Sequence, residues 1–209
     1  MVTESVKIMD AKTKIMFSAI ELFKQYGFKS VTMDDIAHRS GISKKTLYQH
    51  FDNKNAVILA TMAWYKSNMR CECDAMMASA SNAVEAFVKI KVKMDEVYKE
   101  MNPMALHELQ RFYAEGYQQF RDNLETDVAA IRQNLEQGIA EGNYRADIHV
   151  DILARFHMES ILMIMMPNSL SKERDAYKVH LEILEHFLFG IMTPKGEKLY
   201  RKYKEQYLK

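Results

Sequence analysis

Apolar residues recur at helical spacing along most of this chain. One apolar stripe, with steps of three and four residues, begins near Asp10 and stops at Gly27, which predicts an amphipathic helix over that stretch. Only 3 Pro and 7 Gly occur in the 209 residues, a composition that favours long helices over a turn-rich β architecture. We therefore predict an all-α protein. The first stripe consists of Ile15, Ala19, Leu22, Phe23 and Tyr26.

The same pattern divides the rest of the chain into further helices. Residues 34–39 and a segment from Ser43 to about His50 form two short helices, and an uninterrupted helix follows over 54–78. Longer helices are predicted over 81–100, 104–117, 120–140, 147–166 and 172–192. We expect residues 1–9 to form a loose arm, and the Lys- and Tyr-rich tail from Pro194 to be mobile or loosely packed.

The two short helices have the spacing of a helix-turn-helix. The small Ala37 lets two helices approach closely, and Gly41 supplies the turn because glycine tolerates a positive φ. Ser43 is an N-cap residue for the second helix. Leu47 fixes that helix to the core. This combination predicts a second helix built to lie on DNA.

Residues 31–58 resemble the N-terminal DNA-binding domain of the TetR family of bacterial transcriptional repressors, in the run VTMDDIAHRSGISKKTLYQHFDNKNAVI. The resemblance covers about residues 10–60. It implies an N-terminal three-helix helix-turn-helix domain, residues 1–53, and a C-terminal helical ligand-binding and dimerisation domain, residues 54–209. Lys45 departs from the family, which commonly has Gly there. The matching residues are Gly27, Thr32, Ile36, Ala37, Gly41, Ile42, Ser43, Thr46, Leu47, Tyr48, His50, Phe51 and Lys54.

The second short helix carries several candidates for DNA contact. Lys44 and Lys45 lie at its N-terminus, where a recognition helix touches base edges and phosphates. Gln49 is expected to face the groove, because Leu47 and Phe51 must face inward, and its amide suits adenine. The full set of DNA-binding candidates is Thr32, Ser43, Lys44, Lys45, Thr46, Tyr48, Gln49, His50 and Lys54.

Some of these candidates also have a purely structural interpretation. Thr32 is an N-cap, with Asp35 three positions on in an approximate capping box, and its role ends there if it meets no phosphate. Tyr48 and His50 either contact phosphates, as the resemblance implies, or cover the underside of the helix. Lys54 starts the long helix, where its charge and the helix N-terminus suit a phosphate.

The C-terminal part carries candidates for an effector pocket and for a dimer interface. Met and aromatic residues between positions 64 and 117 either line an apolar cavity for a small hydrophobic effector or form ordinary core. The last two predicted helices are apolar all round, which predicts a homodimer through a four-helix bundle, and the family pairs the same two helices. The pocket candidates are Trp64, Met101, Met104, Phe112, Tyr113 and Tyr117, and the interface candidates are Phe156, Ile161, Leu162, Ile183, Leu184, Phe187 and Leu188.

Charge and motifs restrict the other classes of function. The net charge is +1, but nine basic and six acidic residues through position 54 put a basic excess on the proposed DNA-binding domain. Cys71 and Cys73 point apart on a helix and have no second Cys pair, so we expect no metal site. The sequence contains no G-x-G-x-x-G, P-loop, H-E-x-x-H or G-x-S-x-G motif, and we expect neither an enzyme nor a cofactor. The apolar run over 161–167 is too short to span a bilayer, and the polar start predicts no signal peptide, so we expect a cytoplasmic protein with no membrane partner.

We therefore predict a dimeric transcriptional regulator, a repressor released from a palindromic double-stranded DNA operator by an unknown small effector. The first alternative is a regulator without a small-molecule pocket, which binds DNA constitutively or answers to a protein partner. The second alternative is a helical enzyme or adaptor with an incidental helix-turn-helix.

Overall fold

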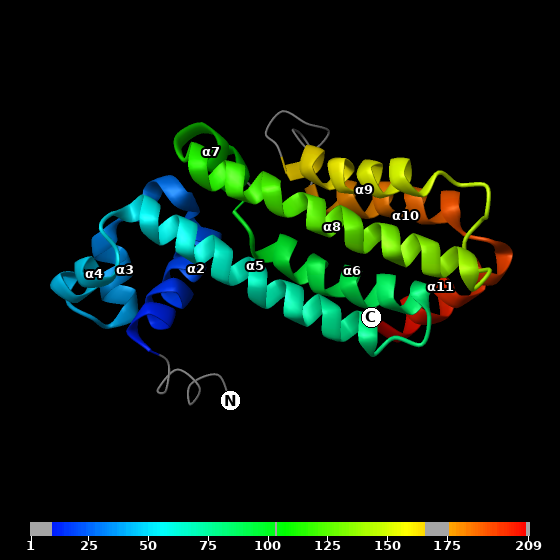
Figure 1. Ribbon diagram of the computed structural model, residues 1–209, viewed down its shortest axis with the longest axis horizontal. Coiled ribbons are helices and arrows are strands. Elements are labelled where there is room, and N and C mark those ends of the chain that lie inside the picture. Colours follow the sequence, from blue (N-terminus) through cyan, green and yellow to red (C-terminus); the bar gives the residue numbers. More distant parts are fainter. Residues whose placement is uncertain (1–9, 103, 166–175, 208–209) are drawn as a thin grey trace. The chain divides into compact units, whose positions relative to one another are not determined.

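The structure, a computed structural model, is built from α-helices and describes residues 10–102, 104–165 and 176–207 (Figure 1). The described part of the chain contains no β-strand beyond an isolated bridge between Tyr144 and Met192, and the predicted all-α class is confirmed. The expected N-terminal arm lies outside the described residues. The helices are α2 (Ala11–Ser30), α3 (Met33–Ser40), α4 (Lys44–His50), α5 (Lys54–Ala78), α6 (Ala83–Glu100), α7 (Ala105–Phe112), α8 (Ala114–Ala140), α9 (Val150–Met165), α10 (Ala176–Ile191) and α11 (Pro194–Tyr207).

The chain divides into two compact units. Unit 1 contains residues 1–69 and 100–120, and unit 2 contains residues 70–99 and 121–209. Helices α5 and α8 therefore contribute residues to both units. The compact units do not coincide with the expected domains 1–53 and 54–209, which describe function rather than packing, and that functional boundary stays a prediction.

The first helix of unit 1 begins where the sequence predicts but ends later than predicted. Asp10 caps α2 by accepting a hydrogen bond from the Thr13 N–H. The helical conformation of α2 breaks at Gly27, whose φ is 79°, although one further turn continues to Ser30. The apolar core of this unit contains described residues that are at most 1% exposed, namely Ile15, Ala19, Phe23, Ile36, Leu47, Val57, Ile58 and Leu109.

The predicted helices over 104–117 and 120–140 are wrong at their junction. Helix α7 ends at Phe112, and α8 already begins at Ala114. Between them Tyr113 has φ −136° and ψ 66°, outside the helical region. Its ring centroid lies 6.2 Å from that of Phe28. This contact joins residues far apart in sequence, so the helical periodicity of the chain does not predict the break between α7 and α8.

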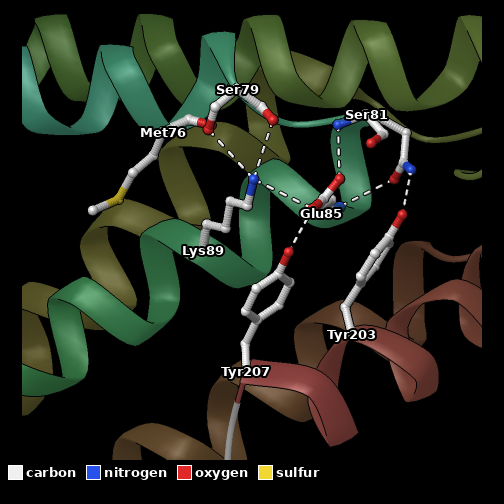
Figure 2. Close-up of polar contacts among 8 residues, drawn as sticks. Met76, Ser79, Ser81, Glu85, Lys89, Tyr203 and Tyr207 are labelled. Carbon is white, nitrogen blue, oxygen red and sulfur yellow. Dashed lines mark hydrogen bonds and ion pairs between the residues drawn. The ribbon is translucent and has the colours of Figure 1, made fainter.

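The predicted loose tail from Pro194 is also wrong, because it forms the helix α11. Tyr200 and Tyr203 are 1% and 6% exposed, and Tyr207 follows on the same face after one more turn. Figure 2 shows the Tyr207 hydroxyl at Glu85 of α6, to which it donates a hydrogen bond of 2.7 Å. Tyrosine rings thus form the apolar face of α11. The many lysines in this segment made that face difficult to recognise in the sequence.

Unit 2 buries several ionisable groups. Lys91 and Asp95 of α6 form an ion pair of 2.5 Å with side chains only 3% and 5% exposed. Burial alone would raise the pKa of Glu85, but hydrogen bonds from the Tyr207 hydroxyl and the Ser81 N–H, with the nearby Lys89, outweigh it and lower the pKa to about 2. These groups lie inside the unit, where each must have partners to be tolerated.

Helices α9 and α10 pack against each other. Their inward side chains include His157, whose ring stacks on that of Phe187 at a centroid distance of 4.7 Å. Burial, and secondarily the neighbouring His180, lowers the pKa of His157 to about 4. The imidazole of His157 is therefore neutral at physiological pH. No helix among the described residues is long and apolar enough to cross a membrane.

Candidate DNA-binding surface

The surface is built on the turn between α3 and α4. Gly41 adopts the left-handed conformation, with φ 63° and ψ 36°, which costs glycine little. Its N–H and that of Ile42 donate to the carbonyls of His38 and Ala37, both at 3.1 Å. These bonds satisfy the last carbonyls of α3. The chain then leaves the turn in the direction fixed by this cap, and α4 begins two residues later.

Helix α4 is attached to unit 1 through one fully buried side chain. Leu47 is 0% exposed and is the only buried residue of the helix. The flanking Phe51 is 5% exposed and closes the end of the helix. All other α4 side chains are exposed except Thr46, which is half-buried. A seven-residue helix held in this way presents most of its surface to solvent.

The sequence candidates on α4 therefore share an accessible helix. Tyr48 is 44% exposed, so part of its side chain is accessible to solvent. Gln49 and His50 are exposed, as expected for residues between the inward Leu47 and Phe51. The exposed candidates are Ser43, Lys44, Lys45, Tyr48, Gln49 and His50. Their contact with DNA stays a prediction.

Two candidate hydroxyls act as helix caps. Ser43 accepts a hydrogen bond of 3.0 Å from the Thr46 N–H. Thr32 accepts one of 3.2 Å from the Asp35 N–H, and Asp35 accepts 2.8 Å and 2.6 Å bonds from the Thr32 N–H and hydroxyl. The capping box is therefore complete. The Thr32 hydroxyl bond, followed by the backbone bond, lowers the pKa of Asp35.

Lys44 has a partner that the sequence did not reveal. Its Nζ lies 2.7 Å from Oδ1 of Asp34, and both side chains are more than half exposed. The hydrogen bond and the charge of Asp34 raise the pKa of Lys44. The pair joins the first turn of α3 to the first turn of α4. A DNA phosphate would have to compete with this carboxylate for the ammonium group.

Lys54 differs from the other candidates because its ammonium group is engaged within unit 1. Its Nζ donates a hydrogen bond of 3.2 Å to the carbonyl of Lys29. It also lies 5.5 Å from the centroid of the Tyr113 ring. The side chain is half-buried. Its predicted phosphate contact is untested, but these contacts give it a structural role as well.

The effector-pocket candidates contact different neighbours within unit 1. The ring of Trp64 meets that of Phe17 edge-on at 6.4 Å, whereas Tyr117 stacks on Phe120 at 6.4 Å. Tyr113 packs on Phe28, as described above. Met101 is half-buried, and Met104 and Phe112 are 41% and 47% exposed. The pocket assignment of Trp64, Met101, Met104, Phe112, Tyr113 and Tyr117 stays a prediction.

The interface candidates are split between core and surface. Leu162, Leu184, Phe187 and Leu188 are at most 7% exposed within unit 2, whereas Ile161 and Ile183 are half-buried. Phe156 is 53% exposed and shares one face of α9 with Ile152 and Met163, which are 65% and 42% exposed. The sequence pattern does not single out Ile152 and Met163, because a helix that is apolar all round does not indicate which face is covered. Their assignment to an interface is untested.

Comparison with known proteins relates both parts of the chain to bacterial regulators. Residues 15–61 match the model of the family described as bacterial regulatory proteins, tetR family. The HTH-type transcriptional repressor KstR2 of Rhodococcus jostii (strain RHA1) is 24% identical over 149 residues, 69% of this chain and 73% of the relative. The negative transcriptional regulator IcaR of the biofilm operon icaADBC, from Staphylococcus aureus (strain Newman), is 38% identical over 60 residues, 29% of this chain and 28% of the relative.

Solved structures show the same fold over most of the chain. A transcriptional regulator of the TetR family from Agrobacterium tumefaciens aligns with a TM-score of 0.71 and 17% identity, over 88% of this chain and 98% of that one. The ketosteroid transcriptional regulator KstR2 of Mycobacterium tuberculosis aligns with a TM-score of 0.58 and 20% identity, over 89% and 97% of the two chains.

Proposed function

Because the chain belongs to the TetR family of DNA-binding transcriptional regulators, we propose that it is a repressor that binds a palindromic operator as a homodimer and is released by a small, hydrophobic effector. The single observation that supports this best is the attachment of α4, in which only Leu47 is buried and the polar side chains remain accessible. Such a helix can enter the major groove without disturbing the core of unit 1.

Each part of α4 has a distinct role in this proposal. Lys44 and Lys45 contact phosphates or guanine edges at the helix N-terminus, and Gln49 reads a base through its amide. Thr32, Tyr48 and His50 position the helix by phosphate contacts. Because phosphate contacts dominate affinity, binding should weaken steeply with salt.

The homodimer would place two copies of α4 in successive major grooves, about 34–36 Å apart. Its interface is supported by the exposed apolar stripe Ile152, Phe156 and Met163 of α9, and the half-buried Ile161 and Ile183 are proposed to contribute to it as well. A stripe of this kind on a protein surface favours association. Leu162, Leu184, Phe187 and Leu188 would then support the interface from within the core. We place this dimer in the cytoplasm, with its DNA.

Effector control is proposed to run through α5, which is continuous from Lys54 to Ala78. An effector that binds one arrangement of the protein better than the other shifts the population by its differential affinity. A change in the separation of the two α4 helices would then lower operator affinity.

The DNA-binding part is tested with the intergenic DNA upstream of the protein's own gene. A gel shift should show salt-dependent binding, and a footprint should cover a palindrome with half-sites one helical turn apart. Protection of a single, non-repeated half-site would contradict the dimer. Absence of any binding to this DNA, at low salt, would contradict the proposal of an operator upstream of the protein's own gene.

The effector part is tested separately by a thermal-shift screen of small apolar molecules. A compound that stabilises the free protein should also release the upstream DNA, because the two binding events are thermodynamically linked. A protein that binds its operator but is stabilised by none of the compounds would favour control by a protein partner or constitutive binding instead.

A further inference from the structure

The end of α2 is held by residues from a distant part of the chain. The last turn of a helix leaves carbonyl groups without partners inside the helix. Here the Lys24 carbonyl accepts a hydrogen bond of 2.8 Å from the Asn102 N–H, and the Phe28 carbonyl accepts one of 3.4 Å from the Tyr113 hydroxyl. Both donors belong to unit 1 although they follow α6 in sequence.

Both peptide groups of Lys29 are also held. Its N–H donates a hydrogen bond of 2.9 Å to Oε2 of Glu108 on α7, and its carbonyl accepts the bond from Lys54 Nζ at 3.2 Å. Lys29 is only three residues before Thr32, the N-cap of α3. Because α2 packs against both α3 and α7, the backbone that leads into the DNA-binding helices is fixed by α5 and α7.

Glu108 reaches this turn because residue 27 is a glycine. A Cβ atom at Gly27 would lie 2.6 Å from Glu108 Oε2 and 3.2 Å from its Cδ. The carboxylate therefore occupies the space that any other side chain would need. The φ of 79° at Gly27 is also one that other residues rarely adopt, so glycine permits both the turn and the contact.

We propose that Glu108 is a positioning residue for the DNA-binding helices. Its carboxylate holds the turn from Gly27 to Lys29, which sets the start of α3 and thereby the direction of α4. The residue lies outside positions 15–61, which match the family model. This inference rests on the proposed operator binding. It assigns Glu108 no contact with DNA, because a carboxylate is repelled by phosphates.

The test compares Glu108→Ala and Glu108→Gln in the full-length protein, with the upstream intergenic DNA as the probe. Glu108→Ala should weaken binding by about tenfold, the loss expected for a hydrogen bond to a charged group. Removal of a negative charge would by itself tighten DNA binding, so weaker binding separates positioning from electrostatics. Glu108→Gln should retain most of the affinity, because its amide oxygen can still accept from the Lys29 N–H.

Glu100→Ala is the matched control on the same segment. Glu100 is also an acidic residue of unit 1, but its side chain is 67% exposed and only pairs with Lys24 at 3.5 Å. We expect the DNA affinity of Glu100→Ala to lie within about twofold of that of the wild type, since exposed ion pairs contribute little. Hydrogen exchange of the Lys29 amide should be faster in Glu108→Ala and unchanged in Glu100→Ala.

Equal or tighter DNA binding by Glu108→Ala, with unchanged exchange at Lys29, would overturn the positioning role while leaving the proposed function intact. A loss of binding that Glu108→Gln does not rescue would also overturn it. If the wild-type protein binds none of the upstream DNA, the proposed function fails first. That result is distinguishable because it does not depend on any variant.

Discussion

The two units differ in where they place their polar side chains. In unit 1, Thr32 and Ser43 cap helices at the surface, and no ionisable side chain is buried among its described residues. In unit 2, Lys91, Asp95 and His157 are buried among helices. Capping contacts are local and tolerate exposure, whereas buried ionisable groups depend on partners and on pH. The first unit should therefore respond mainly to packing and the second mainly to protonation.

The largest expected effect is that of Leu47→Ala. Loss of the one buried α4 side chain should destabilise unit 1 by roughly 4 kcal/mol and abolish operator binding, because no other side chain within α4 is buried in the core. The matched control is Leu135→Ala in unit 2, which removes an equally buried leucine. Hydrogen exchange of α4 amides should accelerate only in the first variant. Similar exchange of α4 in both variants would contradict the separate anchoring of this helix.

The next effect concerns pH and unit 2. The pKa of His157 is lowered to about 4, from an ordinary value of 6.5. Below pH 6.5 the unfolded chain binds a proton that the folded chain does not, so stability should fall by about 3 kcal/mol between pH 6.5 and 4 and stay level above that range. Denaturant unfolding at a series of pH values measures this loss.

His157→Phe tests the assignment of that pH dependence. The substitution keeps an aromatic ring against Phe187 but removes the titrating group. It should remove most of the loss of stability between pH 6.5 and 4. A smaller dependence on pH should remain from His180, whose pKa is also lowered by burial. The loss of stability at more acidic pH should persist, because the pKa of Glu85 is lowered from its ordinary value of 4.5 to about 2 in the folded protein. An unaltered profile above pH 4.5 would assign the dependence to other groups.

A smaller effect is expected at the attachment of α11. Tyr203 is 6% exposed, and its hydroxyl accepts a hydrogen bond of 2.9 Å from Asn82. Tyr203→Phe should lower the stability of unit 2 by about 1 kcal/mol. The control is Tyr48→Phe, whose hydroxyl is on the exposed α4. The urea concentration at the unfolding midpoint should fall for Tyr203→Phe but not for Tyr48→Phe. Equal midpoints for the two variants would argue against a stabilising role for the bond between Tyr203 and Asn82.

The smallest effect is expected at the Asp34–Lys44 pair. Asp34→Asn should tighten operator binding by about two- to threefold, because the carboxylate no longer competes with phosphate and no longer repels it. If the gain acts through Lys44, it should disappear in a Lys44→Ala background. A gain that persists there would indicate general charge repulsion instead.

Local features of unit 1 could be predicted from the sequence because the interactions that fix them join near neighbours. Thr32 bonds to Asp35 three residues away, and Ser43 bonds to Thr46 at the same spacing. The turn at Gly41 likewise follows from one residue's conformational freedom. The N-caps of α3 and α4 and the turn between these helices can therefore be predicted without tertiary information, whereas the contact of α4 with DNA stays a prediction.

The remaining features depend on long-range contacts that periodicity does not encode. Tyr113 interrupts a helix while packing on Phe28, 85 residues away. The tail helix α11 forms against α6, where Tyr207 bonds to Glu85, 122 residues away. In each case the partner, and not the local pattern, determines the structure.

The salt dependence of operator affinity in Lys44→Ala/Lys45→Ala tests whether α4 is the DNA-reading helix. We expect at least about a tenfold loss of affinity and a slope of log affinity against log salt that is shallower by about one to two units. Circular dichroism should remain that of wild type, because both side chains are exposed. A folded variant with wild-type affinity and slope would contradict the claim.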